Sequence, residues 1–275
     1  MKTDSPARAI RIEAAGLSHP GKVRAANEDH FAIMTTQKSV RLRATNLQDT
    51  AILDGLDGPE VHIFIVADGI GGKAHGEIAS GAAVRAVIEY LAEAIDCAKD
   101  FDVDQEMTFL DILSTAVWRG HERLKEMFPE RGGTGTTLTM ATLVWPRAYF
   151  VHAGDSRGYY MRNGALRQFT RDQTMGDDLV DRGAVTEEQA RAGGLYNFLS
   201  SEVGGHLKPS VGVVDLAEGD TLLLCTDGLT KLVPDDRIAA LLAAGSAESA
   251  AQSLIDAALE AGGKDNVTAV VARAK

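Results

Sequence analysis

The residues best suited to chemistry in this chain are aspartates that stand where a predicted strand begins or ends. They are Asp29, Asp68, Asp155, Asp227 and Asp265, and most have a Gly or Asn neighbour in a predicted turn. If the strands lie side by side, these carboxylates converge, and crowded carboxylates repel one another unless cations neutralise them. Oxygen ligands without an accompanying His or Cys set favour Mg²⁺ or Mn²⁺ over zinc or copper.

Asp68 follows the most apolar stretch of the chain. Residues 61–67 read Val-His-Ile-Phe-Ile-Val-Ala and predict a buried strand, and a helical pattern follows the glycines after Asp68. The carboxylate at the strand's end can then meet a ligand, and the turn leaves the Gly69 carbonyl free to coordinate a hard cation. The alternative is that Asp and Gly serve only the chain reversal. Recurrence of the same pattern later in the chain favours a site.

Two cations held by such carboxylates could clamp a phosphoryl group and activate water for its displacement. Arg24 precedes the Glu28-Asp29 pair at the start of another predicted strand. Its guanidinium could hold two phosphate oxygens at once. A Glu-Asp doublet alone carries little weight, since such doublets are common on solvated surfaces.

The elements that must position these residues are read from apolar periodicity and turn signals. Strands are expected over residues 10–18, 30–35, 61–67, 135–144, 148–154, 210–215, 221–226 and 267–273, and helices over 77–98, 105–128, 234–244 and 247–261. Asn163-Gly164 predicts a tight hairpin. Residues 36–59 are interpreted as a strand and a loop, and 171–205 as a lid or insert. Strand groups alternating with helix pairs predict an α+β protein with helices packed outside its sheets.

Length and composition limit the remaining possibilities. The 275 residues contain no linker, so one domain over 1–275 is expected, and we expect a monomer. A formal net charge of −11 without a basic cluster argues against nucleic acid or a membrane as partners. The start lacks an apolar signal core, and Cys97 and Cys225 show no metal-ligand spacing. We therefore expect reduced cysteines and a cytoplasmic protein.

Six short motifs, in order over about residues 10–273, together resemble the metal-dependent protein phosphatases, the type 2C (PPM) family, in a bacterial form. They are Arg24 with Asn27-Glu28-Asp29, Asp68-Gly69-Ile70-Gly71-Gly72, Gly135-Thr136-Thr137, Gly154-Asp155-Ser156-Arg157, Thr226-Asp227-Gly228 and Gly263-Lys264-Asp265-Asn266. Six motifs in the correct order are far more specific than any one of them.

The resemblance implies a central antiparallel β-sandwich with helices on both outer faces, and a two-metal site at one edge. Asp68 would bridge both cations, with the Gly69 carbonyl on one and Asp227 and Asp265 on the other. The remaining implied roles are a water-mediated metal contact for Glu28, orientation of a bound water by Asp29, a third and weaker metal at Asp155 with Asp227, and phosphate binding by Arg24.

The sequence departs from the family at the residue that would protonate the leaving alcohol. Some members have a histidine directly after the first Asp-Gly, where this chain has Ile70, and many bacterial relatives have one where this chain has Lys73. His75 could serve as the proton donor if it reaches the leaving oxygen, although a histidine at a helix start more often caps the helix or faces water.

The predicted activity is hydrolysis of phosphoserine and phosphothreonine in proteins, by direct attack of a hydroxide bound to Mn²⁺ or Mg²⁺. The expected partners are phosphorylated proteins, either a Ser/Thr kinase or its targets, in signal transduction. One alternative is a catalytically silent phosphoprotein-binding module of the same fold, which would require lost metal ligands. Another is a phosphatase acting on a regulator of transcription factors, a branch that usually has sensor domains or lacks the arginine matched by Arg24.

Overall fold

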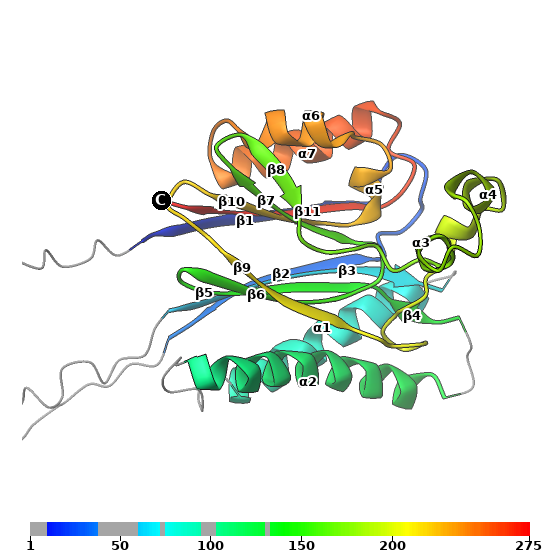
Figure 1. The fold of residues 1–275 in the computed structure, drawn as a ribbon, viewed down its shortest axis with the longest axis horizontal. Helices are drawn as coiled ribbons and strands as arrows, with labels where there is room; N and C mark the ends of the chain where they lie inside the picture. Colours follow the sequence, from blue (N-terminus) through cyan, green and yellow to red (C-terminus); the bar gives the residue numbers. More distant parts are fainter. Residues whose placement is uncertain (1–9, 38–59, 72–74, 95–102, 130–132) are drawn as a thin grey trace, which may run out of the picture.

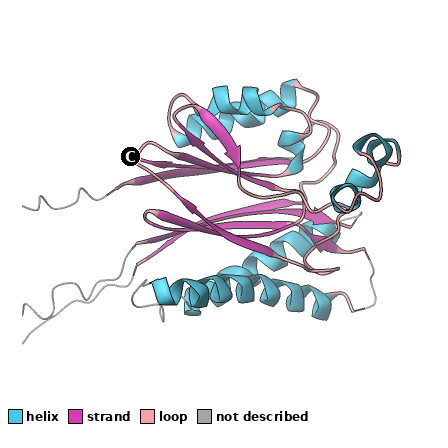
Figure 2. Ribbon diagram, in the orientation of Figure 1, coloured by secondary structure: helices cyan, strands magenta, loops and turns pink. Residues whose placement is uncertain are grey.

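The computed structural model describes residues 10–37, 60–71, 75–94, 103–129 and 133–275. Two antiparallel sheets stack face to face, and helices cover the outer face of each sheet (Figures 1 and 2). This is the four-layer α+β arrangement that the resemblance implies, so the predicted fold class is confirmed.

Each sheet has one long strand order. The first sheet runs β1 (Ile12–His19), β11 (Val267–Ala274), β10 (Thr221–Cys225), β7 (Arg157–Arg162) and β8 (Ala165–Gln168). The second runs β2 (Asp29–Thr36), β3 (Val61–Ile70), β5 (Leu138–Val144), β6 (Arg147–Ala153) and β9 (Ser210–Asp215), and β4 (Gly135–Thr136) pairs with the end of β3.

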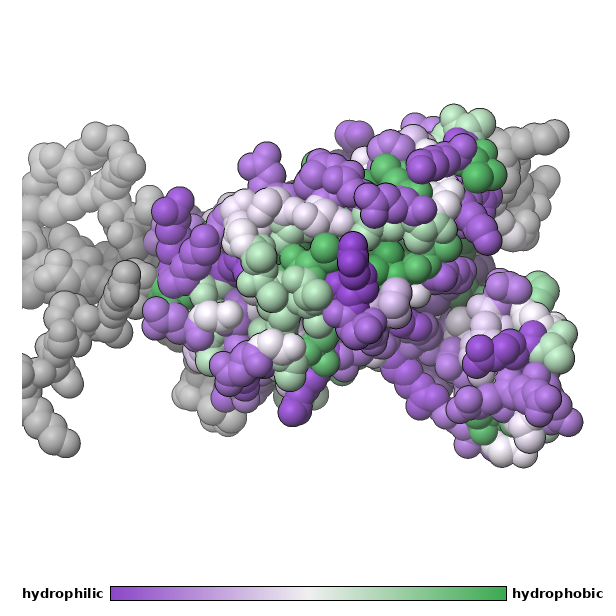
Figure 3. Space-filling view, turned by 90° about the horizontal axis from the view of Figure 1, so that it is seen from above, coloured by the Kyte–Doolittle hydropathy of each residue, from purple (hydrophilic) through white to green (hydrophobic). Residues whose placement is uncertain are grey.

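Helices cover the outer face of each sheet (Figure 1). They are α1 (His75–Ala94) and α2 (Val103–Met127) below, and α6 (Asp235–Leu242) and α7 (Ala247–Glu260) above. Seen from above, apolar side chains gather near the middle of that face and polar side chains surround them (Figure 3). No described helix is long and apolar enough to cross a membrane.

Strand β3 is apolar along its length because both of its faces are buried. Ile63 and Ile65 pack in the core beneath α1 and α2, whereas Phe64 and Val66 pack in the core between the sheets. Buried strands of this kind lose the usual alternation of apolar and polar residues. The strand that carries Asp68 is therefore fixed from both sides.

The structure differs from the predicted boundaries at two points near Asp68. Strand β3 does not end there, because Gly69 and Ile70 continue it by pairing with β4. The strand predicted over 135–144 divides into β4 and β5 at Thr137, whose N–H donates to the Asp68 carbonyl over 2.9 Å. The predicted hairpin is confirmed, with Asn163 and Gly164 both at positive φ.

A four-residue helix, α5 (Asp227–Thr230), was not predicted, because one helical turn is too short to show periodicity. Helix α1 confirms the prediction for 77–98 as far as Ala94, and the rest lies outside the described residues. The strand and loop predicted for residues 36–59 also lie outside the described residues, except for Thr36, which ends β2, and Gln37.

Asn266 holds the loop before β2 against the start of β11. Its buried side-chain amide donates to the carbonyls of Pro20 at 3.0 Å and Ala26 at 2.9 Å. Its Oδ1 accepts the Glu28 N–H at 2.8 Å. One side chain thus fixes the position of Arg24, Glu28 and the start of β2 relative to the opposite sheet.

We predict that Asn266→Ala lowers the free energy of unfolding by roughly 2–4 kcal/mol, because it leaves buried backbone groups without partners. Urea unfolding of the metal-free protein measures the change. Gln252→Ala is the matched control, since its amide bonds only Asp256 on an exposed face of α7, and it should change stability by less than about 0.5 kcal/mol. Equal losses in the two variants would contradict the role given to Asn266.

Candidate functional site

The predicted acidic residues meet at one end of the sandwich, where both sheets contribute. Asp29 and Asp68 lie opposite each other on β2 and β3, while Asp227 follows β10. Asp155 and Asp265 lie just before β7 and β11. A cavity of about 540 Å³ opens here, and its lining includes Arg24, Glu28, Asp68, Gly69, Asp155, Asp227 and Asp265. The structure therefore brings together every predicted site residue, with Asp29 buried beside the cavity instead of lining it.

The backbone of Asp68 is clamped by two threonines of the Gly-Thr-Thr motif. Its N–H donates to Thr137 Oγ1 at 2.9 Å, and its carbonyl accepts Thr136 Oγ1 at 2.8 Å. Burial raises the pKa of the Asp68 carboxyl well above the usual range, and the carboxylates of Asp29 and Asp227 raise it further. A rigid backbone thus holds a carboxyl group that is costly to ionise without a cation.

Asp29 lies beneath this group and links the two sheets. Its Oδ2 accepts the hydroxyl hydrogens of Thr226 and Thr268, each at 2.8 Å. Its Oδ1 is buried and has no protein hydrogen-bond partner. Burial raises the pKa of Asp29 to about 7, against the lowering effect of the two hydroxyls. This orphaned oxygen marks an unmet need for a donor, a water molecule or a cation.

Asp227 and Asp155 share a positive neighbour, Lys231. The Lys231 ammonium forms an ion pair with Asp227 Oδ2 and lies 3.9 Å from Asp155 Oδ2. Burial, together with the Asp227 charge, raises the pKa of Asp155 to about 7. Burial alone would lower the pKa of Lys231, but these two carboxylates raise it. Asp227 Oδ1 stays buried without a hydrogen-bond partner.

A second cationic side chain neutralises the other side of the cluster. Arg24 donates from Nη2 to Asp265 Oδ2 at 2.8 Å. Burial raises the pKa of Glu28 beside them. Among the residues that the structure describes, no three His, Cys, Asp or Glu side chains already stand in a metal-ligating group. Three of the acids are instead paired with cationic side chains, Asp265 with Arg24 and both Asp155 and Asp227 with Lys231.

The glycine after Asp68 is required by close backbone packing. A Cβ on Gly69 would lie 2.2 Å from the Gly76 carbonyl oxygen and 2.8 Å from that of Glu28. The Gly69 N–H donates to the same Glu28 carbonyl at 3.1 Å, and Ser80 Oγ donates to it at 2.6 Å. Glycine therefore lets β3, α1 and the loop before β2 meet at the cavity.

Residues 171–205 stand at this end of the molecule and carry α3 (Met175–Asp181), α4 (Glu187–Ala192) and the 3-10 helix η3 (Leu195–Asn197) (Figure 1). Met175, Phe198 and Leu199 from this segment line the acidic cavity. The segment is anchored at Asp172, which accepts Arg157 Nε at 2.9 Å and Nη2 at 2.8 Å. Apolar side chains therefore flank an otherwise acidic opening.

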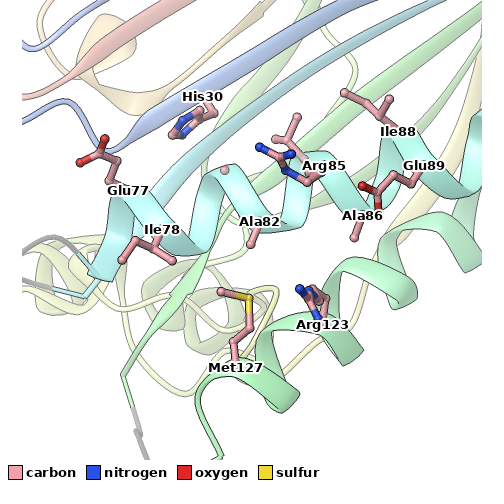
Figure 4. Close-up of a pocket in the computed structure, with 12 residues that line it drawn as sticks. His30, Glu77, Ile78, Ala82, Arg85, Ala86, Ile88, Glu89, Arg123 and Met127 are labelled. Carbon is pink, nitrogen blue, oxygen red and sulfur yellow. The ribbon is translucent and has the colours of Figure 1, made fainter.

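A larger hollow, of about 1150 Å³, lies along α1 (Figure 4). Glu77 and Glu89 line it far apart on the helix, with Arg85 between them and Arg123 contributed by α2. Apolar side chains such as Ile78 make up much of the rest. This hollow lacks converging carboxylates, so the acidic cavity is the candidate functional site.

His75, the suggested proton donor, begins α1 but is not among the residues that line the acidic cavity. Its ring packs edge-to-face against Phe128, with centroids 6.1 Å apart. This geometry gives no support to the proton-donor hypothesis. Lys73 lies outside the described residues.

Sequence reasoning missed the residues that hold the acids in place. The threonines at 226 and 268 bond Asp29, Ser80 bonds the Glu28 carbonyl, and Lys231 pairs with Asp227. Only Lys231 had a usable signal, since a lysine four residues after an aspartate at a helix start lies on the same face. The threonine contacts join distant segments and leave no local pattern.

A family model for protein phosphatase 2C matches residues 36–261. The serine/threonine protein phosphatase PstP of Mycobacterium tuberculosis is 38% identical over 214 residues, which are 76% of this chain and 40% of PstP. The serine/threonine phosphatase stp of Listeria monocytogenes (serotype 4b) is 31% identical over 236 residues, 84% of this chain and 91% of stp.

Solved structures agree with these sequence matches. The catalytic domain of PstP in complex with two manganese ions is 32% identical, with a TM-score of 0.72 over 97% of this chain and 99% of that one. The serine/threonine phosphatase of S. agalactiae is 26% identical, with a TM-score of 0.78 over 96% of this chain and 100% of that one. The chain spans about two fifths of the full length of PstP, 40%. From its fold, its acidic site and these matches, this chain belongs to the protein phosphatase 2C family.

Proposed function

We propose that this chain is a metal-dependent protein serine/threonine phosphatase that hydrolyses phosphoserine and phosphothreonine monoesters with two Mn²⁺ or Mg²⁺ ions. The observation that carries the proposal is the group of carboxylates that both sheets deliver to one cavity, with Asp29 Oδ1 and Asp227 Oδ1 buried and unpartnered. The complex of PstP with two manganese ions supports the choice of metal.

The donor set fits such cations. Every candidate ligand is an oxygen, from Asp68, Asp227, Asp265, the Gly69 carbonyl and Glu28 through a water molecule, and hard divalent cations prefer oxygen. Burial and mutual repulsion raise the pKa values of Asp29, Asp68 and Asp155, a cost that positive charge relieves. When bound, the cations supply the Lewis acidity that activates water and neutralises charge on the transferring phosphoryl group.

The chain's own residues do the positioning. Asp68 is held by the threonine clamp and Asp227 by its place at the start of α5. Asp29, beneath Asp68 and Asp227, orients a water molecule through its unpartnered Oδ1. Arg24 donates to Asp265 in this structure, and with Asp265 holding a cation its guanidinium would be free to bind the substrate's phosphate through two N–H donors.

The described residues that could act as covalent nucleophiles near the site are poorly suited to the task. Cys225 is buried in β10, and burial raises the pKa of its thiol. Ser156 is buried, and its hydroxyl bonds Thr137 Oγ1 at 2.8 Å with no base beside it. These observations favour one-step hydrolysis by activated water without a phosphoenzyme. A silent binding module would require lost ligands, and all the expected carboxylates are present.

We further propose that residues 171–205 act as the lid of a single domain spanning 1–275, since their apolar side chains flank the cavity. The substrates are phosphorylated proteins, either a Ser/Thr kinase or its targets, in cytoplasmic signal transduction. A monomer suffices, because one chain supplies every residue of the site. Sedimentation velocity of the purified protein tests this proposal, because a monomer should sediment with the mass of one chain, 29.2 kDa.

The raised pKa values predict how the metal-free protein responds to pH. Unfolded aspartates titrate near 3.9, whereas Asp29 and Asp155 titrate at about 7 in the folded protein. The folded state therefore holds protons that the unfolded state has lost, and stability falls as pH rises through about 7. In EDTA, the Tm should decrease from about pH 5 to about pH 8.

Saturating Mn²⁺ should remove most of that decrease, and Asp155→Asn should reduce it in EDTA. Differential scanning fluorimetry in matched buffers measures both effects. A Tm in EDTA that rises over the same pH range, or that Mn²⁺ does not change at the alkaline end, would show that the carboxylates are not repelling one another as described.

Asp227→Asn should lower phosphate release from a phosphothreonine peptide by roughly 100-fold or more, because it removes a charge that holds the cations. The assay titrates Mn²⁺ and then adds EDTA. Asp256→Asn, an exposed carboxylate on α7 that bonds only Gln252, should release phosphate at the wild-type rate. Full activity of Asp227→Asn would refute the site assignment, and a folded wild type with no release at any Mn²⁺ concentration would favour the binding module.

Arg24→Ala should raise KM for the phosphopeptide by roughly 10- to 100-fold, since it removes a charge-assisted pair of hydrogen bonds to phosphate. It should leave kcat largely intact. Arg11→Ala, an exposed arginine before β1, is the control and should change neither constant. A fall in kcat with unchanged KM would mean that Arg24 acts on the reaction step instead of on binding.

A further inference from the structure

Lys231 lines the acidic cavity, and the proposed function leaves its charged side chain without a role. It follows α5, and its N–H donates to the Asp227 carbonyl at 2.8 Å. This turn puts the side chains of residues 227 and 231 on the same face. The Lys231 ammonium reaches Asp227 Oδ2 and also lies 3.9 Å from Asp155 Oδ2.

The exposure of the three side chains shows how this contact is built. The carboxylates of Asp155 and Asp227 are 13% and 10% exposed, whereas the Lys231 side chain is 53% exposed. The lysine side chain therefore approaches the pair from the solvent side, with its ammonium directed toward the two carboxylates. Of the carboxylate oxygens of Asp155 and Asp227, Asp227 Oδ1 is the one that is buried without a hydrogen-bond partner.

The two oxygens of Asp227 are thus divided between two kinds of positive charge. Oδ2 is taken by a tethered ammonium, and Oδ1 is left for a cation at the centre of the cavity. Resemblance to the family assigns Asp155 with Asp227 to a third divalent cation. In this chain a lysine already stands between these two carboxylates.

We propose that the Lys231 ammonium is the resident cation of the Asp155–Asp227 pair, so that this chain binds no divalent cation there. The inference rests on the proposed function, which places two cations on Asp68, Asp227 and Asp265. A charge tethered four residues away is present at a high effective concentration. A free Mn²⁺ ion can bind the pair only by displacing it, and the activity therefore needs only the two central cations.

Counting bound Mn²⁺ by calorimetry, with equilibrium dialysis as a second measure, tests this inference. Wild type should bind two ions. Lys231→Met keeps the length of the side chain but removes its charge, so it should bind a third. Lys231→Arg keeps the charge and should bind two. Lys275→Met is the matched control, because Lys275 pairs with Glu13 beside the far end of β11. This variant should also bind two Mn²⁺ ions.

A readout without metal separates this inference from the proposed function. In EDTA, Lys231→Met should lower the Tm by about 2–4 °C, the shift expected for losing a partly buried ion pair in a chain of this size. Lys231→Arg should restore it. If no variant binds Mn²⁺, the two-metal function fails, and the fall in Tm alone still supports Lys231 as the resident cation.

Three results would overturn the inference. One is a wild-type protein that already binds three Mn²⁺ ions. Another is a wild-type protein that binds two ions and a Lys231→Met variant that binds the same number with the same affinities. The third is a Tm in EDTA that Lys231→Met leaves unchanged, since removing a resident cation from two buried carboxylates must destabilise the metal-free protein.

Discussion

Mutual repulsion between buried carboxylates is the constraint on which the rest of this structure depends. Both sheets end at the same edge, and each delivers aspartates to it. Such a group is unfavourable unless positive charge compensates it. Much of the surrounding structure either holds these acids in place or supplies that positive charge. In the proposed chemistry, the excess negative charge of the carboxylates attracts the cations.

The holding interactions come from short polar side chains that bond backbone groups or the Asp29 carboxylate. Thr136 and Thr137 fix Asp68, the hydroxyls of residues 226 and 268 fix Asp29, and Asn266 fixes the loop that carries Arg24 and Glu28. Compensating charge comes from Arg24 and Lys231. The sandwich thus acts as a rigid frame, because β3 and β10 are buried on both faces.

The strands, the hairpin and the acidic residues could be predicted because their signals are local, whereas the β-sandwich was implied by the resemblance to the phosphatase family. A long apolar strand followed by Asp68 and glycines, or a hairpin at Asn163-Gly164, needs only a few neighbouring residues to be recognised. The division of residues 135–144 at Thr137 could not be predicted, because it depends on bonds to Asp68 across the sheet. Lys231 was overlooked because a lysine side chain is usually solvated, and its partner Asp155 is far away in the sequence.

The most direct test of the central claim is the anomalous scattering of manganese in crystals grown with Mn²⁺. We expect two strong peaks inside the acidic cavity, ligated by Asp68, Asp227 and Asp265, with Arg24 separated from Asp265 and no peak between Asp155 and Asp227. Crystals at saturating Mn²⁺ with no peak in this cavity, and with the Arg24–Asp265 pair intact, would contradict the claim that these carboxylates converge in order to bind cations.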